Sequence, residues 1–113
     1  MEGKAVLKFA RVTPTKARMV ANLVRSKDVA QVREICDVVP RKASKLWRKV
    51  VDSAMANLAE KLRVEELDPE QVVVKEIYAD KAVIMKRWET RSQGRAYRIQ
   101  KLTSHLTVVV VER

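Results

Sequence analysis

Residues 81–101, KAVIMKRWETRSQGRAYRIQK, decide the fold that we predict for this chain. β-Branched and aromatic residues are frequent in this stretch and proline is absent, as is typical of β-strands. Around 89–94 the sequence ETRSQG indicates a turn. The stretch is therefore predicted to be an extended β-hairpin at about 82–101, with arms near 83–88 and 95–101. At ~3.3 Å per residue, its tip would lie some 20 Å or more beyond the rest of the protein.

The region before the hairpin begins with a predicted strand at 4–12, followed by helices. Side chains in the strand alternate in character, so Ala5, Leu7 and Phe9 are placed on the face opposite Lys4, Val6 and Lys8.

Three helices are predicted after this strand. Thr13 caps the first helix, with Pro14 at its first position. Asp28 starts a capping-box pattern for a second, short helix that ends at Pro40, and the third runs over about 41–62. The apolar faces comprise Ala17, Val20, Ala21 and Val24, then Val29, Val32, Cys36 and Val39, then Ala43, Leu46, Trp47, Val50, Ala54 and Leu58.

Length and composition indicate one folded domain over residues 1–113. The chain has 113 residues, of which 47% are apolar. At this length roughly two-thirds of the unfolded chain's surface can be buried without disulfides. A further strand is predicted around 72–78, so the element order is β-α-α-α-β-β-β. We expect an α+β fold, with three helices packed on one face of a small antiparallel β-sheet and a long protruding β-hairpin.

The net charge of +10 is concentrated in three segments. Residues 1–27, 41–63 and 81–101 carry +6, +5 and +6, whereas 28–40 and 64–80 carry −2 and −5. A compact protein with this charge is expected to bind a polyanion. For the first segment, a solvated surface without a partner is an equally good interpretation. The acidic 64–80 segment is expected to face solvent or a neighbouring protein.

Five cations occupy the first turns of the third helix, with no carboxylate between Asp37 and Asp52. Positive charge at a helix N-terminus opposes the macrodipole, and like charges four residues apart repel each other by about 0.2–0.5 kcal/mol. Because docked phosphates would remove both penalties, we expect this surface to bind an anionic partner. The five cations are Arg41, Lys42, Lys45, Arg48 and Lys49.

The hairpin carries seven cations and one acid, Glu89. An isolated two-stranded ribbon is marginally stable in water, and this one repels itself unless something negative surrounds it. Trp88 and Tyr97 lie among the cations, and rings and guanidinium planes stack on unpaired RNA bases. The two rings could instead form a cross-strand pair, which we favour for Tyr97 but not for Trp88 near the tip. The cations are Lys81, Lys86, Arg87, Arg91, Arg95, Arg98 and Lys101.

Residue counts exclude most enzyme chemistry. One Cys and one His cannot form a Cys/His metal cluster or an internal disulfide, and two glycines cannot build a Gly-rich phosphate loop. Ser104 and His105 are neighbours in a predicted strand and point to opposite faces, so they form no nucleophile-base pair. The longest apolar runs, four residues, are too short for a membrane span or a signal peptide. We expect a cytoplasmic protein without catalytic residues, cofactor, metal, membrane contact or small-molecule substrate.

Five short motifs occur in the order and spacing of a bacterial ribosomal protein. They are RVTPTKAR at 11–18, SAMAN at 53–57, MKR at 85–87, RSQGRA at 91–96 and KLTSH at 101–105. Because all five are in register over nearly the whole chain, the sequence resembles the large-subunit ribosomal protein family L twenty-two.

The resemblance implies a structural constituent of the large ribosomal subunit that binds 23S-type rRNA and acts in subunit assembly. Its body would lie near the mouth of the polypeptide exit tunnel, beside neighbouring large-subunit ribosomal proteins. Its hairpin would pass through the rRNA and line the tunnel, in contact with the nascent polypeptide. By position, the residues that match the family's basic motifs are Arg11, Lys16 and Arg18, and then Met85, Lys86, Arg87, Arg91, Gly94 and Arg95.

Two alternatives from other classes share the basic charge. A stand-alone RNA- or DNA-binding regulatory or assembly factor would be expected to show a recognition helix or a symmetric dimer surface. An enzyme acting on nucleic acid would need a carboxylate cluster for metal ions, and the basic segments contain almost no acids. The predicted RNA-binding residues are Arg11, Lys16, Arg18, Arg41, Lys42, Lys45, Arg48, Lys49, Lys86, Arg87, Trp88, Arg91, Arg95, Arg98 and Lys101.

Overall fold

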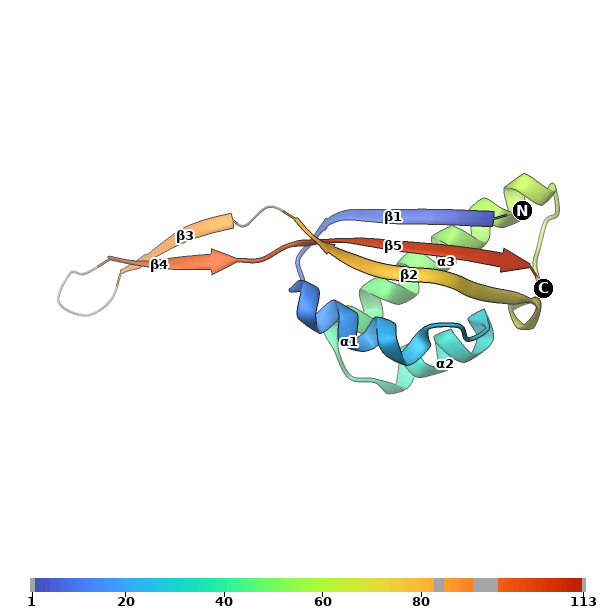
Figure 1. Cartoon of the computed structure of the whole chain (residues 1–113), viewed down its shortest axis with the longest axis horizontal. Helices are drawn as coiled ribbons and strands as arrows, with labels where there is room; N and C mark the ends of the chain where they lie inside the picture. Colours follow the sequence, from blue (N-terminus) through green and yellow to red (C-terminus); the bar gives the residue numbers. More distant parts are fainter. Residues whose placement is uncertain (1, 83–84, 91–95, 113) are drawn as a thin grey trace.

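A computed structural model of the chain describes residues 2–82, 85–90 and 96–112, and for 85–90 and 96–101 it describes the backbone. Figure 1 shows a body of helices and a sheet, with a two-stranded ribbon that protrudes from one end. The molecule measures 61 × 26 × 19 Å. In chain order the elements are β1 (Glu2–Ala10), α1 (Pro14–Val24), α2 (Val29–Val38), α3 (Lys42–Leu62), the 3₁₀ turn η1 (Pro69–Gln71), β2 (Val72–Lys81), β3 (Met85–Thr90), β4 (Ala96–Lys101) and β5 (Ser104–Glu112).

The body contains a three-stranded antiparallel sheet in the order β1-β5-β2. In the central strand, Leu106, Val108 and Val110 are fully buried on the face that the helices cover. This arrangement confirms the predicted α+β class. The predicted order counted four strands, whereas the described residues form five, because the stretch after the predicted turn divides into β4, which ends at Lys101, and β5, which begins at Ser104. Strands β3 and β4 form a separate two-stranded sheet.

Side-chain caps begin the first two helices where the sequence predicts. Thr13 Oγ1 accepts a hydrogen bond from the Lys16 N–H at 3.4 Å, and Asp28 Oδ1 accepts from the Gln31 N–H at 2.8 Å. The predicted apolar faces are buried, except that Val39 and Leu46 are half-buried. Arg41, predicted as the start of the third helix, is its N-cap.

Helix α3 joins the helical layer to the sheet. The fully buried Trp47 donates its indole N–H to the Ala17 carbonyl at 2.9 Å, which ties α3 to α1. At its other end α3 lies directly on β1. The approach is so close that a Cβ added at Gly3 would come within 2.6 Å of Leu58 Cβ and would also meet the Ala54 carbonyl oxygen. Glycine is therefore required here for the close approach of the two backbones.

Helical side chains cover both outer edges of this sheet. On the β2 edge, Arg18 Nε donates to the Ala79 carbonyl at 3.2 Å and an Arg25 Nη donates to the Ile77 carbonyl at 3.0 Å. On the β1 edge, Asn57 Nδ2 donates to the Lys4 carbonyl at 2.7 Å, and Lys61 Nζ donates to the Glu2 carbonyl at 2.8 Å. Two carbonyl groups on each edge are thus bonded to side chains of the same molecule and do not pair with another strand.

The sequence prediction for the first strand differs from the structure in the bounds of the strand and in the side of the sheet on which Phe9 lies. The strand spans Glu2–Ala10 instead of 4–12, and Ala5 and Leu7 lie on the inner side, as predicted. Phe9 does not share their face, because the register shifts between Leu7 and Ala10 and Phe9 takes a positive φ of 57°. Its side chain is exposed instead.

The predicted turn at 89–94 begins two residues too early, because β3 continues to Thr90. Glu89 and Thr90 belong to β3 and pair with Tyr97 and Ala96. β-Propensity at Thr90 and the absence of a local breaker allow the ladder to continue. Residues 91–94 of the predicted turn, and residue 95 of the predicted second arm, lie outside the described residues.

Replacing Gly3 by Ala should lower the free energy of unfolding by about 1–3 kcal/mol, because the added methyl group forces α3 away from β1. Urea denaturation followed by circular dichroism measures the change. Val6→Thr is the matched control in the same strand, since Val6 is exposed, and it should change the value by less than about 0.5 kcal/mol. Equal effects of both substitutions would contradict the close approach.

Candidate nucleic-acid interface

The fold brings two sequence-distant basic segments to one end of the body. Figure 1 shows that α1 and α3 both begin near the end from which the ribbon protrudes, and that both run away from it. The Trp47–Ala17 hydrogen bond fixes the first turns of the two helices beside each other. Since the N-terminus of a helix carries partial positive charge, the helix dipoles and the cations there have the same sign. The result is a strongly positive end of the body next to the ribbon.

At the start of α3, cations take positions where acids would stabilise the helix. Its first turn holds no acidic residue, and its N-cap, Arg41, makes no side-chain capping bond. Lys42, Lys45 and Lys49 are exposed, and within the described part of the chain none forms an ion pair. Arg48 differs, because it pairs with Asp37 of α2. Four of the five predicted cations of α3 thus remain available to an anionic ligand.

The cations before and within α1 divide into free and bonded groups. Arg11 and Lys16 are exposed, and α1 begins near the root of the ribbon. Arg18 and Arg25 donate to carbonyl groups of β2 through their guanidinium groups. The structural contribution of these two arginines was missed by the sequence analysis, although their spacing of seven residues places them on one side of the helix. Arg18 therefore helps to hold β2 in place, whatever else it binds.

The ribbon residues are located by their backbone register. Lys86, Arg87 and Trp88 lie in β3, and Arg98 and Lys101 lie in β4. Trp88 pairs with Arg98, and Tyr97 pairs with Glu89, so the alternative of a directly opposed Trp88–Tyr97 pair is wrong. Each of the two aromatic residues faces a charged partner in the ladder. Predicted site residues Arg91 and Arg95 lie outside the described residues.

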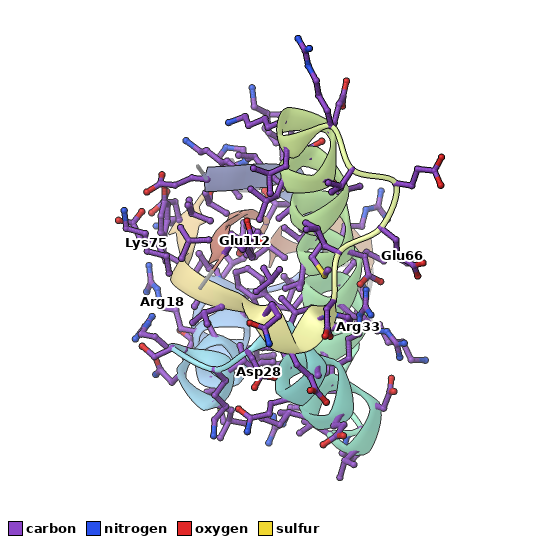
Figure 2. The ribbon with its side chains drawn as sticks, turned by 90° about the vertical axis from the view of Figure 1, so that its right-hand side faces the viewer. Arg18, Asp28, Arg33, Glu66, Lys75 and Glu112 are labelled. Carbon is purple, nitrogen blue, oxygen red and sulfur yellow. The ribbon has the colours of Figure 1, made fainter. Side chains whose placement is uncertain are left out.

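Acidic residues gather at the opposite end of the body. Figure 2 looks onto that end and shows Asp28, Glu66 and Glu112 there. An open hollow of about 400 Å³ at the same end is lined by Asp28, Ala30, Gln31, Glu34, Glu70 and Gln71. Glu65, Glu66, Asp68 and Glu70 precede β2 and are exposed; Glu76 and Asp80 of β2 are also exposed, but Asp80 lies toward the ribbon, where it pairs with His105. Exposed acids are thus frequent at this end, where the exposed cations Lys61, Arg63 and Lys75 also lie.

Groups that could act as nucleophiles or metal ligands are engaged in packing. The Ser104 hydroxyl is buried and donates to the Val12 carbonyl at 2.6 Å, away from His105. Burial raises the pKa of the Cys36 thiol, which favours the unreactive protonated form. Over the described residues, no group of three His, Cys, Asp or Glu side chains could hold a metal ion. Nor does any helix in that part of the chain have the length and apolarity needed to cross a membrane.

Comparison with known proteins gives consistent matches over the full length. Residues 5–111 match the family described as Ribosomal protein L22p/L17e. The chain is 45% identical to the large ribosomal subunit protein uL22 of Clostridium tetani, over 100% of this chain and 99% of the relative. The protein of the same name from Acholeplasma laidlawii is 44% identical over 100% of this chain and 99% of its own length. That of Syntrophobacter fumaroxidans is 43% identical over 100% of both chains.

The division into bonded and free cations can be tested by stability. Arg25→Ala removes the bonds to the Ile77 carbonyl and to Asn22 Oδ1, so the free energy of unfolding should fall by about 1 kcal/mol. Lys16→Ala and Lys45→Ala should change it by less than about 0.5 kcal/mol, because these side chains are exposed. Urea denaturation of the three variants gives the comparison. A loss for Lys16→Ala as large as that for Arg25→Ala would refute the division.

Proposed function

The chain belongs to the ribosomal protein L22p/L17e family, and on that premise we propose that it binds large-subunit rRNA through the basic end of its body and through its ribbon. It is a non-enzymatic, structural protein of the large ribosomal subunit and resides in the cytoplasm as part of the ribosome. The proposal concerns how this chain makes its contacts and which residues make them.

The observation that carries the proposal is the convergence of exposed cations on one end of the body. Arg11 precedes α1, Lys16 lies in its first turn, and Lys42, Lys45 and Lys49 lie in the first half of α3. Phosphates bound there would be neutralised by the lysines and would also be stabilised by the helix N-termini. Release of condensed counterions from the RNA supplies most of the free energy of such binding. The proposed interface therefore needs no cofactor.

The ribbon extends the basic surface away from the body. Its two six-residue strands pair in register from Met85↔Lys101 to Thr90↔Ala96. The segment 81–101 carries seven cations against one acid, so enclosure by phosphates would stabilise it. We infer that the ribbon passes between rRNA segments that are distant in sequence, lines the polypeptide exit tunnel and contacts the nascent polypeptide. In this position it would hold rRNA segments together during subunit assembly.

The acidic end supports the same orientation. Exposed carboxylates such as Glu66 and Glu70 would repel RNA phosphates, so this end is expected to face solvent or neighbouring large-subunit proteins.

Removing the free lysines of α3 should weaken RNA binding without weakening the fold. For Lys42→Gln, Lys45→Gln and Lys49→Gln combined, we expect at least tenfold weaker binding to a large-subunit rRNA transcript. The slope of log K against log[KCl] should become smaller by about 2–3, one unit or slightly less per lost phosphate contact. Filter binding over a series of KCl concentrations measures both, and the melting temperature should not fall, because the lysines oppose the helix dipole.

A matched control removes the same net charge from the acidic end. Lys61, Arg63 and Lys75 are exposed cations of that end, and all three are changed to Gln. Lys75 pairs with Glu2 and Lys61 bonds to its carbonyl, so circular dichroism must first establish that the control is folded. The slope of log K against log[KCl] should then stay within about one unit of the slope measured for the unmodified protein. Equal losses in both triple variants would mean that total charge, and not its position, governs binding.

The ribbon cations should act in assembly and not in folding. Arg87→Ala and Arg95→Ala are expected to reduce the amount of protein that co-sediments with large subunits after a high-salt wash, while the melting temperature of the free protein stays unchanged. Gradient sedimentation and thermal denaturation provide the two readouts. Retention of both variants at the level of the unmodified protein would exclude a role of these side chains in holding rRNA.

A further inference from the structure

Phe9, the single phenylalanine of the chain, is displayed on the surface in an unfavourable backbone conformation. Its side chain is 57% exposed, although it lies within β1. Its φ is 57°, in the left-handed region that bulky residues rarely adopt. Both exposure of the ring and the positive φ cost free energy, and glycine would avoid both. Strained residues of this kind cluster at functional sites.

A bulge in the β1–β5 ladder orients the ring. Leu7 pairs with Leu106 and Ala10 pairs with Ser104, so Lys8 and Phe9 together oppose the single residue His105. The Phe9 N–H donates to His105 Nδ1 at 3.2 Å. The two rings meet edge to face, with centroids 4.9 Å apart and planes at 78°. Bulges commonly redirect a side chain next to a binding site, and here both rings are fixed at the surface.

The tautomer of His105 leaves a donor on this surface. Because Nδ1 accepts a hydrogen bond, the neutral imidazole carries its proton on Nε2. His105 is half-buried, and within the described residues Nε2 has no hydrogen-bond partner. Beside the aromatic ring there is thus an N–H group that can bond to a polar edge.

Charges around the bulge favour a nucleotide over an apolar partner. Lys8 lies in the bulge, Arg11 follows it, and Lys81 pairs with Ser104 across the sheet; all three cations are exposed. Asp80, which pairs with His105, is the one acid opposite the bulge in the ladder, and it would keep phosphates on the side of Lys8 and Arg11. On the same sheet face, the exposed apolar residues Val6 and Tyr78 lie on either side of Thr107 in the register.

We propose that Phe9 and His105 form a stacking site for one unpaired base of the large-subunit rRNA, with the adjoining phosphates held by Lys8 and Arg11. An aromatic ring with cations beside it is the usual arrangement for binding single-stranded nucleotides, since the ring stacks on the base and the cations bind the backbone. The site rests on the proposed rRNA binding and adds to it a residue that the charge pattern alone did not select.

The test compares four variants of Phe9 for affinity to a large-subunit rRNA transcript at fixed KCl, by filter binding. Phe9→Gly and Phe9→Leu should bind on the order of tenfold more weakly, because the stacking ring is lost. Phe9→Tyr and Phe9→Trp should keep affinity within about twofold, because a stacking ring remains. Val38→Ala, at a 79% exposed apolar residue of α2, serves as the control and should bind normally.

Thermal denaturation of the free protein separates binding from folding. Phe9→Gly should melt no lower than the unmodified protein, since glycine adopts the positive φ without strain. A large fall of its melting temperature would instead assign Phe9 to packing and overturn the proposal. If Phe9→Gly or Phe9→Leu bound the transcript as tightly as the unmodified protein, the proposal would also be overturned. The exposed ring would then be assigned to contact with a neighbouring protein. If the unmodified protein itself failed to bind the transcript, the proposed function would fall, independently of Phe9.

Discussion

The double pairing of β5 is the constraint on which the rest of the structure depends. Its backbone bonds to β1 on one side and to β2 on the other, and its inner side chains are fully buried beneath the helices. The chain leaves the body from β2 and returns into β5, so the root of the ribbon is fixed by the most buried strand of the protein. A mobile core strand would leave the direction of the ribbon undefined. The two arms of the ribbon therefore continue from two strands, β2 and β5, that are paired with each other in the body.

Local sequence patterns predicted the elements because their causes are local. The caps at Thr13 and Asp28, the prolines next to helix ends and the apolar spacing of α1 and α3 act within a few residues. The family resemblance rested on five motifs spread over the chain, and the full-length comparisons support it. The position of each basic segment on an element could also be predicted, since it requires only the element boundaries.

Features that depend on contacts between distant residues could not be predicted. The exposure of Phe9 arises from a register shift against β5, almost a hundred residues later in the sequence. A count of charges treats Arg18 and Arg48 as free cations. In the structure, Arg18 donates a hydrogen bond to the Ala79 carbonyl and Arg48 pairs with Asp37. That α1 and α3 begin at the same end, near the ribbon, follows from the Trp47 packing and from the sheet order. The cations can thus be counted from the sequence, but the three-dimensional fold decides which of them share a surface.

The bonded carbonyl groups at the edges of the sheet bear on self-association of the protein before it joins the subunit. A newly made chain waits among many identical copies, and sheet edges with unbonded carbonyl groups would let two such copies join strand to strand. Arg18 and Arg25 on one side, and Asn57 and Lys61 on the other, occupy these groups with side chains of the same molecule. Three of the four are cations, which also repel a second basic copy. These side chains therefore disfavour strand-to-strand pairing between two copies at the four carbonyl groups.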